Sequence, residues 1–261
     1  MAEVSTGRDH GNRTRRPSRR TRGLLNDRTV SSGSVFSTIL ITMVVSDMAP
    51  ADVVDRLVDV GCGDSPYRSS ISHQQYIGID RRPRGSETML TVGDATSLPL
   101  VSGSANAILC TEVIEHVLDE RSLALELHRI ACVGAPLLLS APFVHGLHEQ
   151  PFDFRRLTSL GLMMILEEAG WQVEEVASIG GPVVVALDGC VRWCDSMWHR
   201  VLRFVAPNML ASRFRMVPSE LVQRALAAIV SRQSNYLGPV DPAAAVPRLT
   251  LGYVVRARRM I

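Results

Sequence analysis

The chain has 261 residues, enough for one large domain or for a domain with an appended cap. Its 28 basic residues are all arginine, and together with 26 acidic residues they leave a net charge of +2. The acidic residues gather between positions 50 and 186 and the arginines on either side, which argues against a nucleic-acid channel across the middle of the chain.

The cysteines and the apolar segments bear on where the protein resides. Five cysteines, an odd number without a Cys-x-x-Cys pair, indicate free thiols in a reducing compartment. No apolar run reaches the roughly 18 residues that a membrane-spanning helix needs. We therefore expect a cytoplasmic protein, with a peripheral contact at the inner membrane face as the open alternative.

The first elements lie before residue 54. Residues 1–34 are rich in Arg, Ser, Thr and Gly and lack hydrophobic periodicity, which predicts a disordered, Arg-rich tail. The apolar segment VFSTILITMVV at 35–45 is too short to span a membrane and has no clear cleavage site after it, so a signal peptide is disfavoured. We expect a short helix or strand there that packs on a core domain spanning residues 35–186.

Short apolar runs alternate with helical stretches from about residue 54 onward. The strand candidates are RLVDVG (56–61), QYIGID (75–80), ETMLTVGD (87–94), NAILCTE (106–112), LLLSAP (137–142) and WQVEEVASIG (171–180). Helices are predicted over 119–132 and 158–170, where apolar spacing, Thr158 and Gly170 provide the helical face and the start and stop signals. Alternation of this kind implies a parallel sheet covered on both faces.

The last segment, LTLGYVVRARR at 249–259, is predicted to be the final strand of the core, within 241–261. The stretch before it is far too long for a simple loop, so residues 187–240 are expected to form a helical insertion or cap. Its apolar residues stand at helical spacing among arginines. It would cover the substrate cleft or form a dimer contact, or, over 187–236, lie at a membrane surface and take a lipid-linked acceptor.

Ligands bind to an open parallel sheet at the carboxyl ends of its strands. Small and acidic residues follow the first four predicted strands, namely Asp59, Gly61 and Gly63, then Asp80, then Asp94 and Ala95, then Thr111 and Glu112. The two glycines allow a ligand to press against the backbone of the first loop.

The chemistry of this first loop disfavours a phosphate. Asp59 and Asp64 would repel a pyrophosphate, Pro66 replaces the third glycine of a nicotinamide fingerprint, and there is no lysine for a phosphate-binding loop. The same acids suit an ammonium or sulfonium group, and Asp80, seventeen residues after Gly63, is placed to bind both hydroxyls of a ribose. A positively charged amino-acid nucleoside without phosphate is S-adenosylmethionine.

Over about residues 54–180 the sequence resembles the class I S-adenosylmethionine-dependent methyltransferases of the small-molecule type 11 group. The resemblance rests on six stretches in the family's order: LVDVGCGDSPYR, YIGID, TVGDATSLPL, ANAILCTEVIEHV, ELHRI and LLLSAPF. The resemblance implies an α/β, Rossmann-like, doubly wound seven-stranded sheet, mostly parallel with an antiparallel last strand. It also implies S-adenosylmethionine as cofactor and methyl transfer to a small-molecule, lipid or glycan acceptor, with O-methylation preferred. The sequence VGAP at 133–136 departs from the family's usual Pro-Gly-Gly, which changes a turn.

The resemblance further implies a set of cofactor contacts. These are Asp59, Gly61 and Gly63 at the methionine end, Asp80 at the ribose, Asp94 and Ala95 at the adenine, and Thr111 and Glu112 near the methyl group. A non-catalytic protein that keeps the fold for binding or assembly is the alternative, and a nicotinamide oxidoreductase is disfavoured by Pro66 and the acids of the first loop.

The motif EVIEHV places Glu112, Glu115 and His116 at i, i+3 and i+4, on one face of a predicted helix start. Two carboxylates and an imidazole could bind a divalent metal ion, or His116 could act as a general base. In the third interpretation Glu115 caps backbone and His116 packs beneath the cofactor. We expect no metal site.

The motif HGLHEQPFDFRRLT at 145–158 is similar to a pattern found in a subgroup of the family. The pattern falls on His148, Pro151, Asp153, Arg156 and Thr158. A His–Asp set of this kind could remove a proton from an acceptor, whereas a salt-bridged loop with Thr158 as a helix cap is the structural alternative. His116, His148 and Asp153 are the catalytic candidates.

Overall fold

The structure is a computed structural model, and it describes residues 35–82, 90–205, 238–239 and 249–261. The predicted tail at 1–34 and most of the predicted insertion at 187–240 lie outside the described residues. The expectations for these two segments stay predictions.

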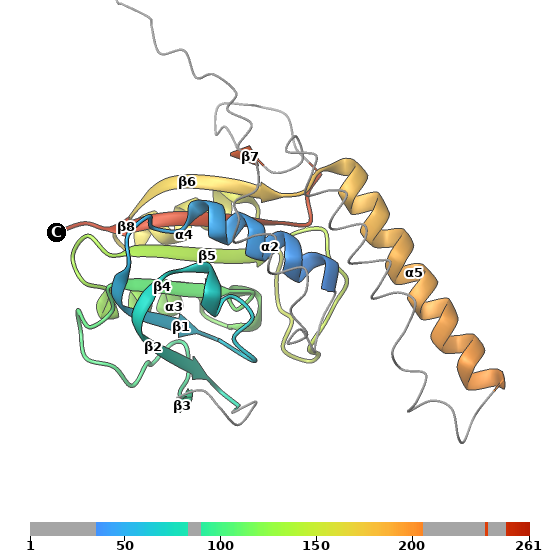
Figure 1. Cartoon of the computed structure of the whole chain (residues 1–261), viewed down its shortest axis with the longest axis horizontal. Helices are drawn as coiled ribbons and strands as arrows, with labels where there is room; N and C mark the ends of the chain where they lie inside the picture. Colours follow the sequence, from blue (N-terminus) through green and yellow to red (C-terminus); the bar gives the residue numbers. More distant parts are fainter. Residues whose placement is uncertain (1–34, 83–89, 206–237, 240–248) are drawn as a thin grey trace, which may run out of the picture.

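One mixed sheet forms the centre of the molecule (Figure 1). Its strands are β1 (Val54–Val60), β2 (His73–Asp80), β3 (Leu90–Val92), β4 (Ala107–Thr111), β5 (Pro136–Pro142), β6 (Trp171–Ile179), β7 (Gly238–Pro239) and β8 (Gly252–Arg259). They follow the order β3-β2-β1-β4-β5-β8-β6-β7. The first five lie parallel, and β8 runs antiparallel to both β5 and β6. The predicted α/β sheet with an antiparallel last strand is confirmed, and the two-residue β7 is an addition.

The central strands are buried on both faces, which explains their continuous apolar sequences. All five residues of β4 are buried, as are Leu137, Leu138 and Leu139 of β5. Alternate residues serve two different cores, because Ile108 faces one cluster of side chains and Leu109 the other. Parallel strands that share this burial bring their carboxyl ends, and the loops after them, to the same edge.

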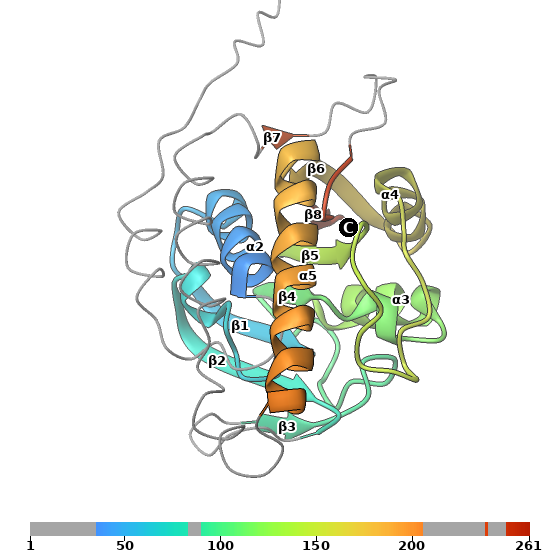
Figure 2. The same ribbon diagram turned by 90° about the vertical axis from the view of Figure 1, so that its right-hand side faces the viewer.

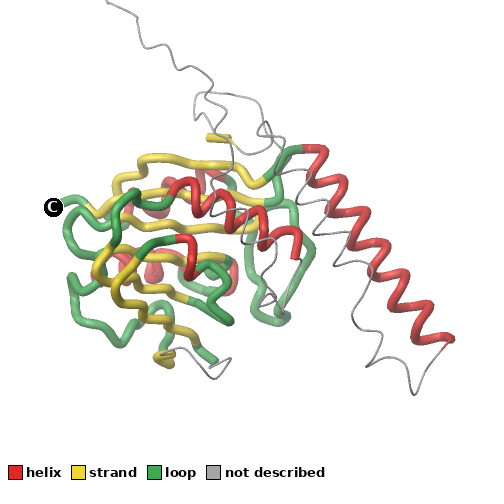
Figure 3. The backbone as a smooth tube through the Cα atoms, viewed as in Figure 1, coloured by secondary structure: helices red, strands yellow, loops and turns green. Residues whose placement is uncertain are grey.

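Helices cover the two faces unequally (Figure 3). Helices α3 (Glu120–Ile130) and α4 (Ser159–Glu168) pack on the face of Ile108. Asp119 and Thr158 precede them as N-caps and accept hydrogen bonds from main-chain N–H groups of the first turn. The opposite face is covered by α2 (Val35–Met48), which precedes the sheet in the chain.

The expected alternation of strand and helix is therefore incomplete. Only a single 3₁₀ turn, η1 (Arg68–Ser70), stands between β1 and β2. The connection is short, and α2 supplies the cover that a crossover helix would otherwise give. Residues 35–45 do form a helix that packs on the domain, as the sequence predicted.

After β6 the chain enters α5 (Pro182–Val205), so the predicted helical insertion begins with a helix, five residues earlier than expected. Figure 2 shows α5 crossing in front of the strand ends, from β6 toward β3. Within the described part of the chain, none of the helices combines the length and apolar character that crossing a bilayer requires.

If α2 is an integral layer of the domain, truncating its core side chain should destabilise the whole fold. Leu40 is fully buried against the sheet, so Leu40→Ala is expected to lower the free energy of unfolding by about 2–5 kcal/mol in urea denaturation. Val101→Ala, at a side chain that is 74% exposed, is the control and should change it by less than about 0.5 kcal/mol. An equally small change for Leu40→Ala would mean that α2 does not pack as described.

Candidate functional site

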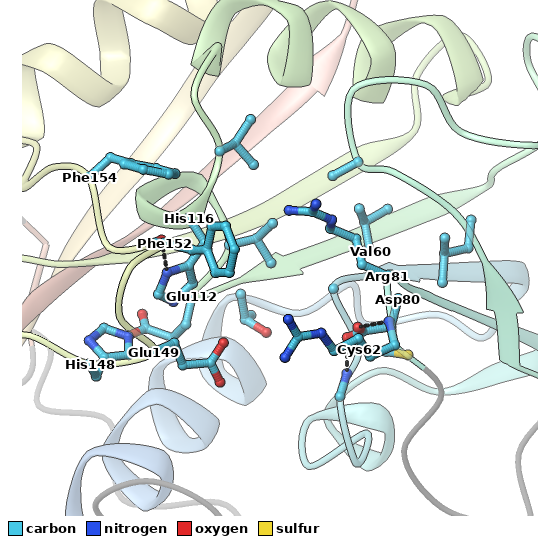
Figure 4. A pocket seen from close by; sticks show the side chains of 18 of the residues that line it. Val60, Cys62, Asp80, Arg81, Glu112, His116, His148, Glu149, Phe152 and Phe154 are labelled. Carbon is cyan, nitrogen blue, oxygen red and sulfur yellow. Dashed lines mark hydrogen bonds between the residues drawn. The ribbon is translucent and has the colours of Figure 1, made fainter.

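A cavity of about 1170 Å³ lies at the carboxyl edge of the parallel strands. Figure 4 shows part of its wall, with side chains from the loops after β1, β2, β4 and β5. The predicted site residues that line it are Gly61, Gly63, Asp80, Asp94, Ala95, Thr111, Glu112, His116 and His148. Pockets for a single drug-sized ligand are roughly 300–1000 Å³, so this cavity is at least large enough for one small organic ligand.

Two predicted residues do not reach the cavity, and their expected direct contacts are corrected here. Asp59 is 1% exposed and lies behind the glycine loop, where its Oδ2 accepts a hydrogen bond of 2.7 Å from the Tyr76 hydroxyl. Asp153 has a side chain that is 1% exposed and accepts two hydrogen bonds, of 2.6 and 2.8 Å, from the guanidinium of Arg156. Both carboxylates can only act through neighbouring groups.

The glycine loop after β1 adopts a backbone that other residues rarely adopt. Gly61 has a φ of +70°, and a Cβ atom there would stand 2.2 Å from Cγ2 of Val113. Gly63, with a φ of +49°, donates its N–H to Oδ2 of Asp80 at 2.9 Å. The loop is thereby fixed against the end of β2, and its backbone forms a wall of the cavity.

Asp94 is held by the turn that follows β3. Thr96 donates its main-chain N–H and its hydroxyl to Oδ1 of Asp94, at 2.9 and 2.7 Å. These hydrogen bonds lower the pKa of Asp94, with a smaller contribution from Arg81. Asp94 therefore presents a fixed negative charge on the same cavity as Asp80.

Glu112 stands at the end of β4 in a strained conformation. Its φ of +55° is unusual for a residue with a side chain, and such strain persists mainly where the surroundings impose it, as at functional sites. Its N–H bonds to Ser140 of β5, and the Ser140 hydroxyl donates to Oε1 of Glu112 at 2.8 Å. Burial, together with the nearby charge of Glu115, raises the pKa of Glu112 to about 8.

The predicted helix face of Glu112, Glu115 and His116 is wrong, because the segment forms a single 3₁₀ turn, η2 (Ile114–His116). The turn directs Glu115 toward the loop after β5. There Oε1 of Glu115 lies 3.6 Å from Nε2 of His116 and 3.7 Å from Nε2 of His148. The sequence had placed these two histidines in separate motifs.

Some of the lining could not be found from sequence patterns. Ser37, Thr38 and Ile41 of α2 line the cavity, and so does Arg192 of α5. The Arg192 guanidinium donates to Nε2 of His145 and to the Ser37 hydroxyl, joining α5, the loop after β5 and α2. Helix α2 is mostly apolar, and Ser37 and Thr38 belong to no sequence motif that points to a ligand.

The cavity has two chemically different parts (Figure 4). The part beside the glycine loop carries Asp80 and Asp94, and we call it the donor side. The part beside the loop after β5 carries His116, His148 and Phe152, and we call it the acceptor side. Glu112 also lines the cavity, and Figure 4 labels it on the same side as His116 and His148.

Part of the chain is similar in sequence to known methyltransferases. Residues 58–139, less than half of the chain, match the family model described as a methyltransferase domain. A protein of Mycolicibacterium smegmatis named a probable S-adenosylmethionine-dependent methyltransferase is 27% identical over 139 residues, which is 47% of this chain and 54% of that protein. Norajmaline N-methyltransferase of Rauvolfia serpentina is 30% identical over 107 residues, 34% of this chain and 37% of that protein. The chain thus spans only about half or less of the length of these relatives.

The fold has solved counterparts as well. The crystal structure of a SAM-dependent methyltransferase from Thermotoga maritima, described as a possible histamine N-methyltransferase, superposes with a TM-score of 0.53 and 17% identity. The superposition covers 86% of this chain and 89% of that one. The shared fold extends well beyond the residues that the family model matches.

The buried Asp59 should make stability depend on pH. Burial raises the pKa of Asp59 to about 7, against the hydrogen bond from Tyr76, which lowers it. A carboxyl whose pKa is higher in the folded protein stabilises it fully below about pH 4, and this contribution is lost as the pH rises through about 7. From pH 4 to 8, wild type should therefore lose on the order of 2–4 kcal/mol of unfolding free energy relative to Asp59→Asn.

Urea denaturation at a series of pH values measures this difference. The matched control is Asp55→Asn, the same substitution at an exposed position of β1, and its curve should run parallel to that of wild type. Parallel curves for Asp59→Asn and wild type would contradict the description of Asp59 as a buried carboxyl with a raised pKa.

Proposed function

We propose that the chain is a class I S-adenosylmethionine-dependent methyltransferase of type 11, which transfers a methyl group from S-adenosylmethionine to a small organic acceptor. The observation that carries the proposal is that Asp80 and Asp94 line one cavity with the Gly61–Gly63 loop, inside the segment that matches the methyltransferase domain. One relative, norajmaline N-methyltransferase, is named for a small-molecule substrate, which supports the acceptor class.

The donor side fits the chemistry of this cofactor. S-adenosylmethionine supplies a methyl carbon that its sulfonium already activates, so the protein has chiefly to bind and align the two reactants. The carboxylate of Asp80 can accept hydrogen bonds from ribose hydroxyls, and Asp94, with the Ala95 backbone beside it, can accept from an adenine amino group. Gly61 and Gly63 leave their backbone open to the methionine end, with Asp59 supporting the loop from behind.

Thr111 and Glu112 are proposed to stand near the methyl group. Thr111 is the last residue of β4 and Glu112 follows it, and both line the cavity. A positive sulfonium beside Glu112 would stabilise its carboxylate, whose pKa burial otherwise raises. The strained backbone of Glu112 is then explained by the need to bring this group to the methyl position.

The acceptor side is proposed to orient the nucleophile. His116 and His148 line it, and Asp153 positions His148 through a hydrogen bond of 2.9 Å from the His148 main-chain N–H. The roles of His116 and His148 at the acceptor, and of Asp153 behind them, are part of the proposal.

Oxygen is the proposed methyl acceptor, because a histidine-rich wall suits an acceptor that must lose a proton or bind as an anion. Norajmaline N-methyltransferase acts at nitrogen by its name, and it is similar to this chain over only 34% of it. A lipid-linked or glycan acceptor remains within the proposal. Mass spectrometry of products from hydroxyl, carboxyl and amine acceptors distinguishes the cases, and exclusive N-methylation would refute the preference for oxygen.

The donor assignment predicts a loss of affinity when Asp80 is neutralised. Asp80→Asn should weaken S-adenosylmethionine binding by about 10- to 100-fold in isothermal titration calorimetry, because a hydrogen bond to a charged group contributes about 1.5–3 kcal/mol. Asp55→Asn, the same change at the far end of β1, should bind like wild type.

Two outcomes would count against the proposal. Equal affinity in wild type and Asp80→Asn would refute the assignment of Asp80 to the ribose. Wild-type protein that binds the cofactor but methylates none of a broad acceptor panel would favour a non-catalytic binding protein that has kept the fold.

A further inference from the structure

Against the expectation from the sequence, we propose that Glu115, His116 and His148 bind one divalent transition-metal ion on the acceptor side of the cavity. One atom from each residue, a carboxylate oxygen and two imidazole nitrogens, lies within 4.8 Å of the other two. Figure 4 shows the two imidazoles on neighbouring loops, beside the cavity. Binding of the ion does not depend on the proposed methyl transfer.

The spacing suits a shared ion. Zinc-like ions bind imidazole nitrogen at about 2.0–2.1 Å and carboxylate oxygen at about 2.0–2.2 Å, which puts two ligands of one tetrahedral ion roughly 3.3–3.5 Å apart. Oε1 of Glu115 is 3.6 Å from Nε2 of His116 and 3.7 Å from Nε2 of His148. A movement of a few tenths of an ångström would bring both pairs to the required separation.

The hydrogen bonds behind the histidines leave the right nitrogens free. Nδ1 of His116 lies 2.7 Å from the carbonyl oxygen of Phe152, which can only accept, so Nδ1 carries the proton and Nε2 offers a lone pair. Nδ1 of His148 faces Oδ2 of Asp153 at 3.4 Å, another acceptor, and its Nε2 also points to Glu115. Metal-binding histidines characteristically donate their second N–H to a carbonyl or carboxylate in this way.

Glu115 provides an independent argument for the ion. Its side chain is 1% exposed, and among the described residues neither carboxylate oxygen has a hydrogen-bond partner. The nearest imidazole nitrogens stand at 3.6 and 3.7 Å, beyond hydrogen-bond distance, and a buried carboxylate held only by such long contacts calls for a cation or a proton nearby. The main-chain oxygen of Glu115 accepts from the N–H of Phe154 at 2.9 Å, which fixes the turn and holds the side chain between the two imidazoles.

The ligand set selects the class of metal. Two imidazoles and one carboxylate favour Zn²⁺, Co²⁺ or Fe²⁺ over Mg²⁺ and Ca²⁺, which prefer oxygen ligands. Both imidazoles line the cavity while Glu115 lies behind them, so an unfilled position of the ion would face the cavity. If the proposed function holds, that position would take an oxygen of the acceptor and lower its pKa, so that no side-chain base is needed at the reacting atom.

Metal titration of the full chain tests the site. The protein carries Cys190→Ser and Cys194→Ser, which remove two exposed thiols as competing ligands, and is stripped with EDTA. Calorimetry with Zn²⁺ and visible absorption with Co²⁺ should each give one equivalent per chain. His148→Ala and Glu115→Gln should each weaken binding more than about tenfold. His73→Ala, at a histidine on β2 outside the cluster, should bind like the parent.

Melting temperatures measured with and without Zn²⁺ separate a loss of metal binding from a loss of stability in the variants. The parent and His73→Ala should gain melting temperature with Zn²⁺, whereas His148→Ala should not, whatever its starting value. Binding that is absent in the parent, or equal in His148→Ala and His73→Ala, would overturn the metal site. S-adenosylmethionine affinity of the EDTA-treated parent is measured alongside, so that failure of the metal site and failure of the proposed function are told apart.

Discussion

The hydrogen bond from Gly63 to Asp80 ties the loop after β1 to the end of β2, and the shape of the donor side depends on it. Parallel pairing of β1 with β2 brings the two groups to one edge, and the positive φ values of Gly61 and Gly63 turn the loop toward that edge. A second main-chain N–H, that of Arg82, donates to the other oxygen of Asp80 at 3.0 Å. The carboxylate is thus oriented before any ligand arrives, and a preorganised group loses less entropy on binding.

The carboxylates of Asp59 and Glu115 are buried behind the cavity wall, and their environments differ. Asp59 lies in an apolar environment beside Tyr76, and a proton can relieve its charge because its pKa is raised to about 7. Glu115 faces two imidazoles instead, which can offer positive charge or hold an ion that does. The sheet edge therefore combines a rigid, acidic donor side with an acceptor side whose charge depends on what the histidines bind.

The sequence predicted those features that depend on local pattern or on the general geometry of parallel sheets. Such rules predicted the strands, the helix start at Thr158, and the position of Asp80 and Asp94 at one edge of the sheet. It did not predict the pairing of Glu115 with His148, because that depends on the path of an irregular loop and on a 3₁₀ turn in place of a helix. From the sequence we expected Asp59 to contact the ligand. In the structure its side chain is buried and accepts a hydrogen bond from Tyr76, away from the cavity.

The donor side and the acceptor side are built largely from different segments of the chain. The donor side is built within residues 58–139, the segment that matches the methyltransferase domain. The acceptor side draws on the loop after β5, on α2 and on α5, where Arg192 joins Ser37 to His145 across all three. These elements lie outside the matched segment, and only Glu115 and His116 of the acceptor side lie inside it, so similarity to relatives says more about the donor than about the acceptor. The acceptor must therefore be inferred from the chemistry of this chain's own residues, above all its cluster of histidines around a buried glutamate.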